Sequence, residues 1–189
     1  MVARNHLEFG MPMSNTSAVV KEKFEREFEK LKTSDIRMKD EKKSPKQTIY
    51  ISVNGMDPAP QGSKKHVGYG RLIEASKRVK PWRQLVSELS RQQMLDQHSN
   101  IIDGACEVNI IFRFERPKSH FTTNGQLKAN APPHCIVKRN DIDKCCRSTL
   151  DALTGCVFAD DCLVARLTAE KRYCFGSEPA GALITVTAL

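Results

Sequence analysis

The chain has 189 residues, a length that suits one domain with a proper core and a terminal tail. A net charge of +8 makes it basic, and this charge favours a polyanionic partner. The longest apolar runs fall far short of the roughly 18 residues that a membrane span needs, which argues against an integral membrane protein.

The cysteine pattern does not fit a disulfide-stabilised secreted protein. There are seven cysteines, an odd number, and no cleavable signal sequence precedes them. No Cys-x-x-Cys motif occurs, so a zinc site using His134 and Cys135 is the weaker interpretation. We therefore expect reduced, buried thiols in a cytoplasmic protein.

Residues 1–46 differ in character from the rest of the chain. Apolar residues with helical spacing predict an amphipathic helix over Ser17–Lys32, and the charged stretch from Thr33 to Lys46 predicts a flexible linker. We interpret 1–46 as an N-terminal helical extension and 47–189 as the folded domain.

The predicted elements of the domain alternate between strands and helices. A β-branched, alternating run predicts a strand over 47–54, and two prolines and two glycines break regular structure over 55–62. Further along, the pattern predicts a helix over 80–97, a strand over 107–114, a long loop over 116–135, a helix from about 141 to 154, and two closing strands over 163–175 and 182–189. This order predicts a small α/β (α+β) fold.

A strongly basic segment lies between Gly62 and Leu85, where seven cationic residues face one acid, Glu74, and leave +6. A solvated loop would explain it without function, but the density of charge favours contact with a nucleic-acid backbone. The candidate DNA-binding residues are Lys64, Lys65, Arg71, Lys77, Arg78, Lys80 and Arg83, together with Lys138 and Arg139 before the acidic helix.

Carboxylates crowd around the helix that begins near residue 141. Asp141 and Asp143 stand at its start, and Asp160-Asp161 follow a short turn after Gly155. Asp141 is placed to cap the helix, which would account for one acid and leave Asp143 and Asp161 unexplained. Crowded carboxylates repel one another unless a cation lies between them, and hard oxygen ligands suit Mg²⁺, with Mn²⁺ as the alternative. We expect the turn after Gly155 to bring Asp161 back to the same end of the helix.

Carboxylates that hold a metal, next to a basic surface, indicate metal-assisted phosphodiester hydrolysis. The Asp-x-Asp motif also occurs in haloacid-dehalogenase-like phosphatases, where it ends an apolar strand. Here Lys138-Arg139-Asn140 precede the motif and a helix follows it, so that interpretation is disfavoured.

The ordered motifs resemble the RusA family of Holliday junction resolvases, in its phage and prophage branch. The resemblance rests on Asp141-Ile142-Asp143, on Leu150-Asp151-Ala152-Leu153, on Asp160-Asp161 and on the Pro-x-Pro-x-Gly of 58–62, and it covers about residues 47–189. It implies a mixed sheet packed with two main helices, a homodimer, and Mg²⁺-dependent cleavage of branched DNA in recombination and repair. No nucleotide cofactor and no membrane partner are implied.

Carried over by position, Asp141, Asp143 and Asp161 would be the essential metal-binding carboxylates, with Asp160 as a supporting acid. Arg147 stands where the family usually has a catalytic lysine, and it could clamp phosphate but not donate a proton. Asn140 replaces the usual proline and Lys144 the usual asparagine. These departures keep open an alternative, a non-catalytic protein that binds branched DNA.

Overall fold

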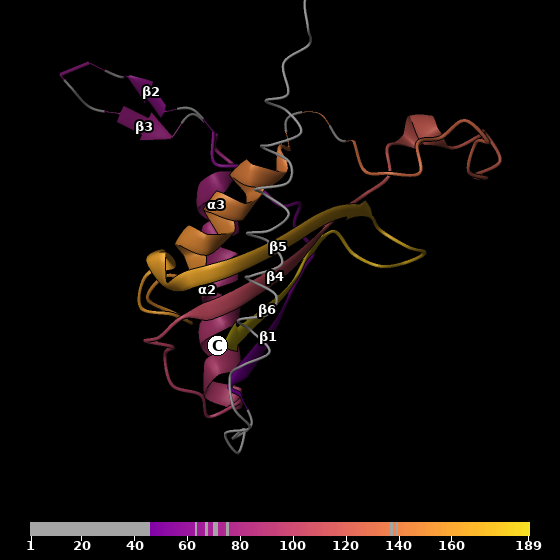
Figure 1. The fold of residues 1–189 in the computed structure, drawn as a ribbon. Coiled ribbons are helices and arrows are strands. Elements are labelled where there is room, and N and C mark those ends of the chain that lie inside the picture. The colour runs from indigo at the N-terminus through magenta and orange to yellow at the C-terminus, as the bar shows by residue number, and fades with distance from the viewer. Residues whose placement is uncertain are drawn as a thin grey trace, which may run out of the picture. The chain divides into compact units, whose positions relative to one another are not determined.

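The computed structural model describes residues 46–62, 64–66, 68–69, 72–74, 76–136, 138 and 140–189. Four strands form a mixed sheet in the order β1-β6-β4-β5 (Figure 1). Their bounds are β1 Thr48–Asn54, β4 Cys106–Phe114, β5 Val164–Tyr173 and β6 Gly181–Ala188. β6 pairs antiparallel with β1 and β4, whereas β5 pairs parallel with β4. The predicted α+β fold with a mixed sheet and two main helices is confirmed.

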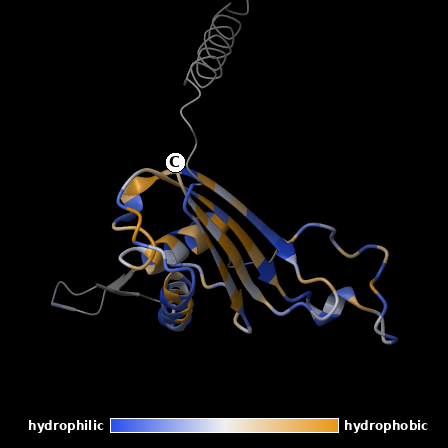
Figure 2. Cartoon of the chain, turned by 90° about the horizontal axis from the view of Figure 1, so that it is seen from below, coloured by the Kyte–Doolittle hydropathy of each residue, from blue (hydrophilic) through white to orange (hydrophobic). Residues whose placement is uncertain are grey.

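One face of the sheet is apolar because the strands alternate in hydropathy. Ile49, Ile51 and Val53 of β1 are buried, while Tyr50 on the opposite face is 64% exposed. The same alternation places Val108 and Ile110 of β4 in the core, and Figure 2 shows hydrophobic and hydrophilic residues alternating along the strands. The buried face therefore defines the side on which the helices pack.

Two helices cover this face, α2 over Val79–Asp96 and α3 over Ile142–Leu153. α2 contacts β1 and α3 contacts β5, and the two helices pack against each other. Both helices lie close to their predicted positions. Since α3 connects the parallel strands β4 and β5, these three elements form a β-α-β crossover.

Two parts of the domain lie outside the four-stranded sheet. The basic segment forms an antiparallel pair, β2 (Lys64–His66) and β3 (Leu72–Glu74), which the sequence did not predict. The predicted long loop contains a short 3-10 helix, η1 (Lys118–His120), and an isolated β-bridge between Phe121 and Leu127, and Figures 1 and 2 show the loop extending away from the sheet. His120 packs edge-on against Tyr173, with ring centroids 5.6 Å apart.

The two closing strands form as predicted, but they do not pair with each other, because β4 lies between them. The connection that joins them is tied to the sheet by Glu178, which accepts two hydrogen bonds from Arg172 and one from the buried Arg113. These cations hold the pKa of Glu178 well below its ordinary value, at about 2.

None of the seven cysteines forms a disulfide bond, and five of them are buried. In the described part of the chain, no helix is long and apolar enough to cross a membrane. The predicted helix over Ser17–Lys32 lies outside the described residues, and so does the linker after it, except for Lys46.

Candidate functional site

The start of α3 is fixed by what its buried face contacts. Cys145, Ser148 and Thr149 are buried on this face. Thr149 accepts a hydrogen bond from the indole nitrogen of Trp82 on α2 at 3.2 Å, and Trp82 is fully buried. Burial raises the pKa of the Cys145 thiol to about 12, so this residue is a neutral core group.

The proline-rich segment before the basic residues packs its backbone against the same helix. Ser148 Oγ donates to the carbonyl of Ala59 at 2.5 Å, and the amide of Gln61 donates to the carbonyl of Lys144 at 3.0 Å. Prolines favour extended backbone and keep the segment out of regular structure, so its backbone groups pair with neighbouring elements. The Pro-x-Pro-x-Gly motif therefore helps to position the acidic helix, a role that the sequence alone did not reveal.

Asp141 takes the N-cap position of α3, but its carboxylate does not cap the helix. It makes no hydrogen bond to the backbone amides of the first turn. Instead it accepts a hydrogen bond from Lys144 Nζ at 2.5 Å, and both side chains are about half exposed. The predicted capping role is wrong for the side chain, because a lysine three residues along competes for the carboxylate.

The electrostatics at this end of α3 favour the ionised form of Asp141. The hydrogen bond from Lys144, with its positive charge and the more distant charge of Lys171, holds the pKa of Asp141 below its ordinary value. The reciprocal contact raises the pKa of Lys144. Lys171, on β5, also donates to the carbonyl of Asn140 at 3.0 Å and so ties the end of β5 to the start of α3. No sequence signal pointed to Lys171, which is 31 residues from Asn140.

Asp143 and Arg147 are both exposed and lie one turn apart on α3. The planar guanidinium group of an arginine at this exposed position, near the acids, could donate two hydrogen bonds to a phosphate group.

The second acidic pair lies beyond the other end of α3. Asp160 accepts a hydrogen bond from the amide of Cys162 at 2.9 Å and caps the short helix η2 (Asp161–Leu163), which lowers its pKa. Asp161 is exposed, and η2 contacts α3 and leads directly into β5.

The expectation that Asp161 returns to the same end of the helix as Asp141 is wrong within one chain. Parallel strands β4 and β5 start at the same end of the sheet, so α3 must run back along them. Its start lies at the end of β5, as the bond from Lys171 to Asn140 shows, whereas Asp161 precedes the start of β5. A helix of 12 residues spans about 18 Å, so these carboxylates do not meet in one chain. Consistently, the described residues contain no group of three or more His, Cys, Asp or Glu side chains placed to hold a metal ion.

The residues at the start of α3 do fit a Mg²⁺ ion that keeps several waters. Such an ion is commonly held by one or two carboxylates together with substrate phosphate. Asp141 and Asp143 supply two exposed carboxylates there. The buried side-chain oxygen of Asn140 has no hydrogen-bond partner among the described residues, which makes it a further uncommitted oxygen beside them.

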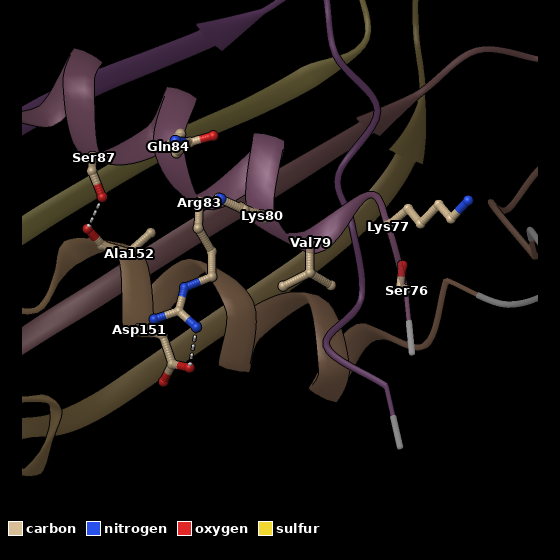
Figure 3. Close-up of a pocket in the computed structure, with 9 residues that line it drawn as sticks. All are labelled: Ser76, Lys77, Val79, Lys80, Arg83, Gln84, Ser87, Asp151 and Ala152. Carbon is tan, nitrogen blue, oxygen red and sulfur yellow. Dashed lines mark hydrogen bonds and ion pairs between the residues drawn. The ribbon is translucent and has the colours of Figure 1, made fainter. Parts of the chain in front are cut away.

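Some of the basic residues that border the helices form ion pairs or hydrogen bonds within the domain, whereas others are exposed to solvent. A groove of about 590 Å³ between α2 and the C-terminal half of α3 is lined by Lys77, Lys80 and Arg83 (Figure 3). Arg83 forms an ion pair with Asp151 at 3.3 Å, while Lys77 and Lys80 are exposed. Figure 3 shows Lys77 extending away from the other lining residues.

Arg78 is also engaged, since it donates to the carbonyl of Pro58 at 3.0 Å and lies 3.9 Å from Asp57. Lys138 is exposed. Arg71 and Arg139 lie outside the described residues, and for Lys64 and Lys65 the structure describes the strand but not the side chains. The DNA-contact candidates that the structure shows to be exposed are therefore Lys77, Arg78, Lys80 and Lys138, and of these Arg78 is engaged with Pro58 and Asp57.

The sequence profile of a family described as "Endodeoxyribonuclease RusA" matches residues 55–187, which include both helices, both acidic pairs and the sheet except for β1 and the last residue of β6. The chain belongs to the RusA family of endodeoxyribonucleases. A comparison with individual curated proteins gave no match.

Proposed function

We propose that this protein is a Mg²⁺-dependent endodeoxyribonuclease that resolves four-way junctions or other branched DNA by paired nicks, in recombination and repair in a bacterial cytoplasm. Family membership supplies the endodeoxyribonuclease class. The observation that carries the proposal is the exposed carboxylate pair at the start of α3, whose acids are not used to cap the helix.

In this proposal Asp141 and Asp143 hold the metal ion, with Mn²⁺ as a substitute. Bound there, the ion would lower the pKa of a water molecule and neutralise charge on the scissile phosphate. Arg147 would clamp a phosphate oxygen through its guanidinium, and it supplies no proton because the group stays charged. Lys77 and Lys80 would bind backbone phosphates away from the cleaved bond.

Asp143→Asn tests the proposal. It should lower Mg²⁺-dependent nicking of a labelled four-way junction by about 100-fold or more, since it removes a metal ligand. Junction binding should be retained, because the exposed side chain contributes little to folding. Asp96→Asn, at an exposed aspartate at the end of α2, is the matched control. Mg²⁺-dependent nicking that survives in the Asp143 variant would overturn the metal assignment.

A second candidate function is binding of branched DNA without cleavage. It is favoured by the ammonium group of Lys144, which lies against the carboxylate of Asp141 where a metal ion would bind. A wild-type protein that binds the junction tightly but leaves it intact in both Mg²⁺ and Mn²⁺ would establish this function instead.

A further inference from the structure

A second cavity lies beyond the ends of β4 and β5. The amide of Cys174, the first residue after β5, donates to the carbonyl of Phe114, the last residue of β4. Two segments therefore leave the same end of the sheet, the long loop after β4 and the connection 174–180 between β5 and β6 (Figure 1). Residues of both segments line a cavity of about 680 Å³.

The lining of this cavity includes apolar side chains that the fold leaves exposed. Phe175 is 72% exposed and Leu127 is 53% exposed. The isolated β-bridge between Phe121 and Leu127 places these two side chains on the same face of the long loop. Single exposed apolar residues are common on protein surfaces, but several that line one cavity indicate a binding site.

Phe175 is held in a fixed position. Its amide donates to Glu178 Oε2 at 3.1 Å, and the guanidinium of Arg172 lies 4.8 Å from the centre of its ring. Arg172 is fixed in turn by two hydrogen bonds to Glu178, at 2.6 and 2.8 Å. These bonds are the main reason that the pKa of Glu178 is about 2, so the arrangement persists at neutral pH. A ring that is fixed before binding loses little conformational entropy when a ligand stacks on it.

The charges around the cavity favour a nucleobase over a phosphate group. Two acids line it, the exposed Glu115 and Glu178. Arg116 also lines it, but its guanidinium lies over the ring of Tyr173 at 4.1 Å and donates to the carbonyl of Pro132. Carboxylates repel a phosphate, whereas they accept hydrogen bonds from the amino groups of bases. An aromatic ring stacks on the flat face of any base.

The cavity also lies within reach of the proposed cleavage site. Lys171 donates to the carbonyl of Asn140, the residue before Asp141. Phe175 follows Lys171 by four residues, which span at most about 14 Å of extended backbone. One strand of a DNA duplex rises about 3.4 Å per nucleotide, so this length corresponds to about four nucleotides. A strand bound at the start of α3 can therefore place a nearby base in the cavity.

We propose that this cavity holds an unpaired nucleobase of the DNA substrate, stacked on the open face of Phe175 a few nucleotides from the cleaved phosphate. The inference rests on the proposed function for its DNA substrate. Bases of an intact duplex are paired and stacked, so the cavity fills only where the DNA branches or its pairing is broken. Phe175 thereby favours branched DNA over duplex, and Arg172 and Glu178 are positioning residues for its ring.

The binding of a base can be followed without cleavage. Four-way junctions carry aminopurine, a fluorescent analogue of adenine that brightens when it leaves the base stack, at single positions within about four nucleotides of the branch point. The full chain is added in EDTA. Wild type should raise the emission at one or more of these positions. Phe175→Ala should abolish most of this rise, whereas Phe175→Tyr, which keeps an aromatic ring, should retain it.

Affinity separates stacking from a merely structural role. Phe175→Ala should weaken junction binding about tenfold, the scale of losing one stack between a base and an aromatic ring. Binding to linear duplex should change by less than about twofold, because a duplex offers no unpaired base. Leu95→Ala removes a side chain of similar exposure, 71%, at the end of α2 and is the control that should change neither affinity.

The outcomes separate the two proposals. Emission and affinity that stay unchanged in Phe175→Ala would overturn the base site, and so would equal losses of affinity for junction and duplex. Wild-type protein that nicks no branched DNA, yet raises the emission through Phe175, would overturn the nuclease and support the base site. Asp143→Asn should lose nicking and keep the rise in emission, because it acts on the metal ion and not on the base.

Discussion

The two faces of α3 differ in burial, in charge and in the groups that they contact. The buried face carries Ser148 and Thr149, and both make hydrogen bonds to other segments of the domain. The exposed face carries Asp143 and Arg147, and Asp141 precedes them at the helix start. The buried face thus sets the position of the acids, while the exposed face is free to meet metal and DNA. Substitutions on the buried face should therefore lower the free energy of unfolding, whereas substitutions on the exposed face should change DNA cleavage.

The largest effect is expected at Trp82, which packs against the buried face. Trp82→Ala should lower the free energy of unfolding by about 3–5 kcal/mol, because it leaves a cavity and removes the hydrogen bond to Thr149. Denaturation followed by circular dichroism measures this loss. Trp82→Phe keeps most of the ring and should lose less, and equal losses in the two variants would show that packing does not hold α3 here.

A smaller loss of stability is expected at Ser148. Ser148→Ala removes the donor to the Ala59 carbonyl and leaves that buried group without its partner, at a cost of about 1–3 kcal/mol. Cleavage at saturating Mg²⁺ should remain within a few-fold of wild type at a temperature where the variant is folded. Thr123→Ala, at an exposed position of the long loop, is a control for loss of a hydroxyl group in urea denaturation.

Much of this organisation could be predicted from the sequence, because it depends on local periodicity. Apolar spacing predicted a helix from about 141 to 154, close to the observed α3, and alternation predicted β1 and β4. The position of Asp161 was predicted wrongly, since a short connection after Leu153 keeps the chain at the end where the helix stops. The capping role of Asp141 was also predicted wrongly, because capping statistics do not include a competing lysine at the third position.

Other features had no local signal. The bond from Lys171 to Asn140 joins residues that only the β-α-β crossover brings together. The pairing of β5 with β4, rather than with β6, also depends on the whole sheet and not on either strand.

The smallest effect is expected on the exposed face, at Lys144. Lys144→Asn removes the cation that lowers the pKa of Asp141, so this pKa should rise toward its ordinary value. A lowered pKa keeps a carboxylate ionised to lower pH, and without Lys144 protonation begins at higher pH. The acid limb of the pH–rate profile should therefore move to higher pH.

The same substitution should change the response to metal at neutral pH, where Asp141 is ionised in both proteins. The Mg²⁺ concentration for half-maximal cleavage should fall by about threefold, the scale of losing one exposed ion pair. Lys118→Asn, an exposed lysine in the long loop, should change neither quantity. An unchanged acid limb in the Lys144 variant would show that Asp141 does not control cleavage at low pH.

Trp82 is the single tryptophan of the chain, and it lies fully buried between the two helices. Its fluorescence therefore reports on one event, the docking of α2 against the helix that carries the acids. A variant that keeps the native emission maximum but fails to cut DNA has lost catalysis while its helices remain packed. A red-shifted maximum shows instead that Trp82 has become exposed because α2 no longer packs against α3. The protein thus contains its own optical control for every acidic substitution at the candidate site.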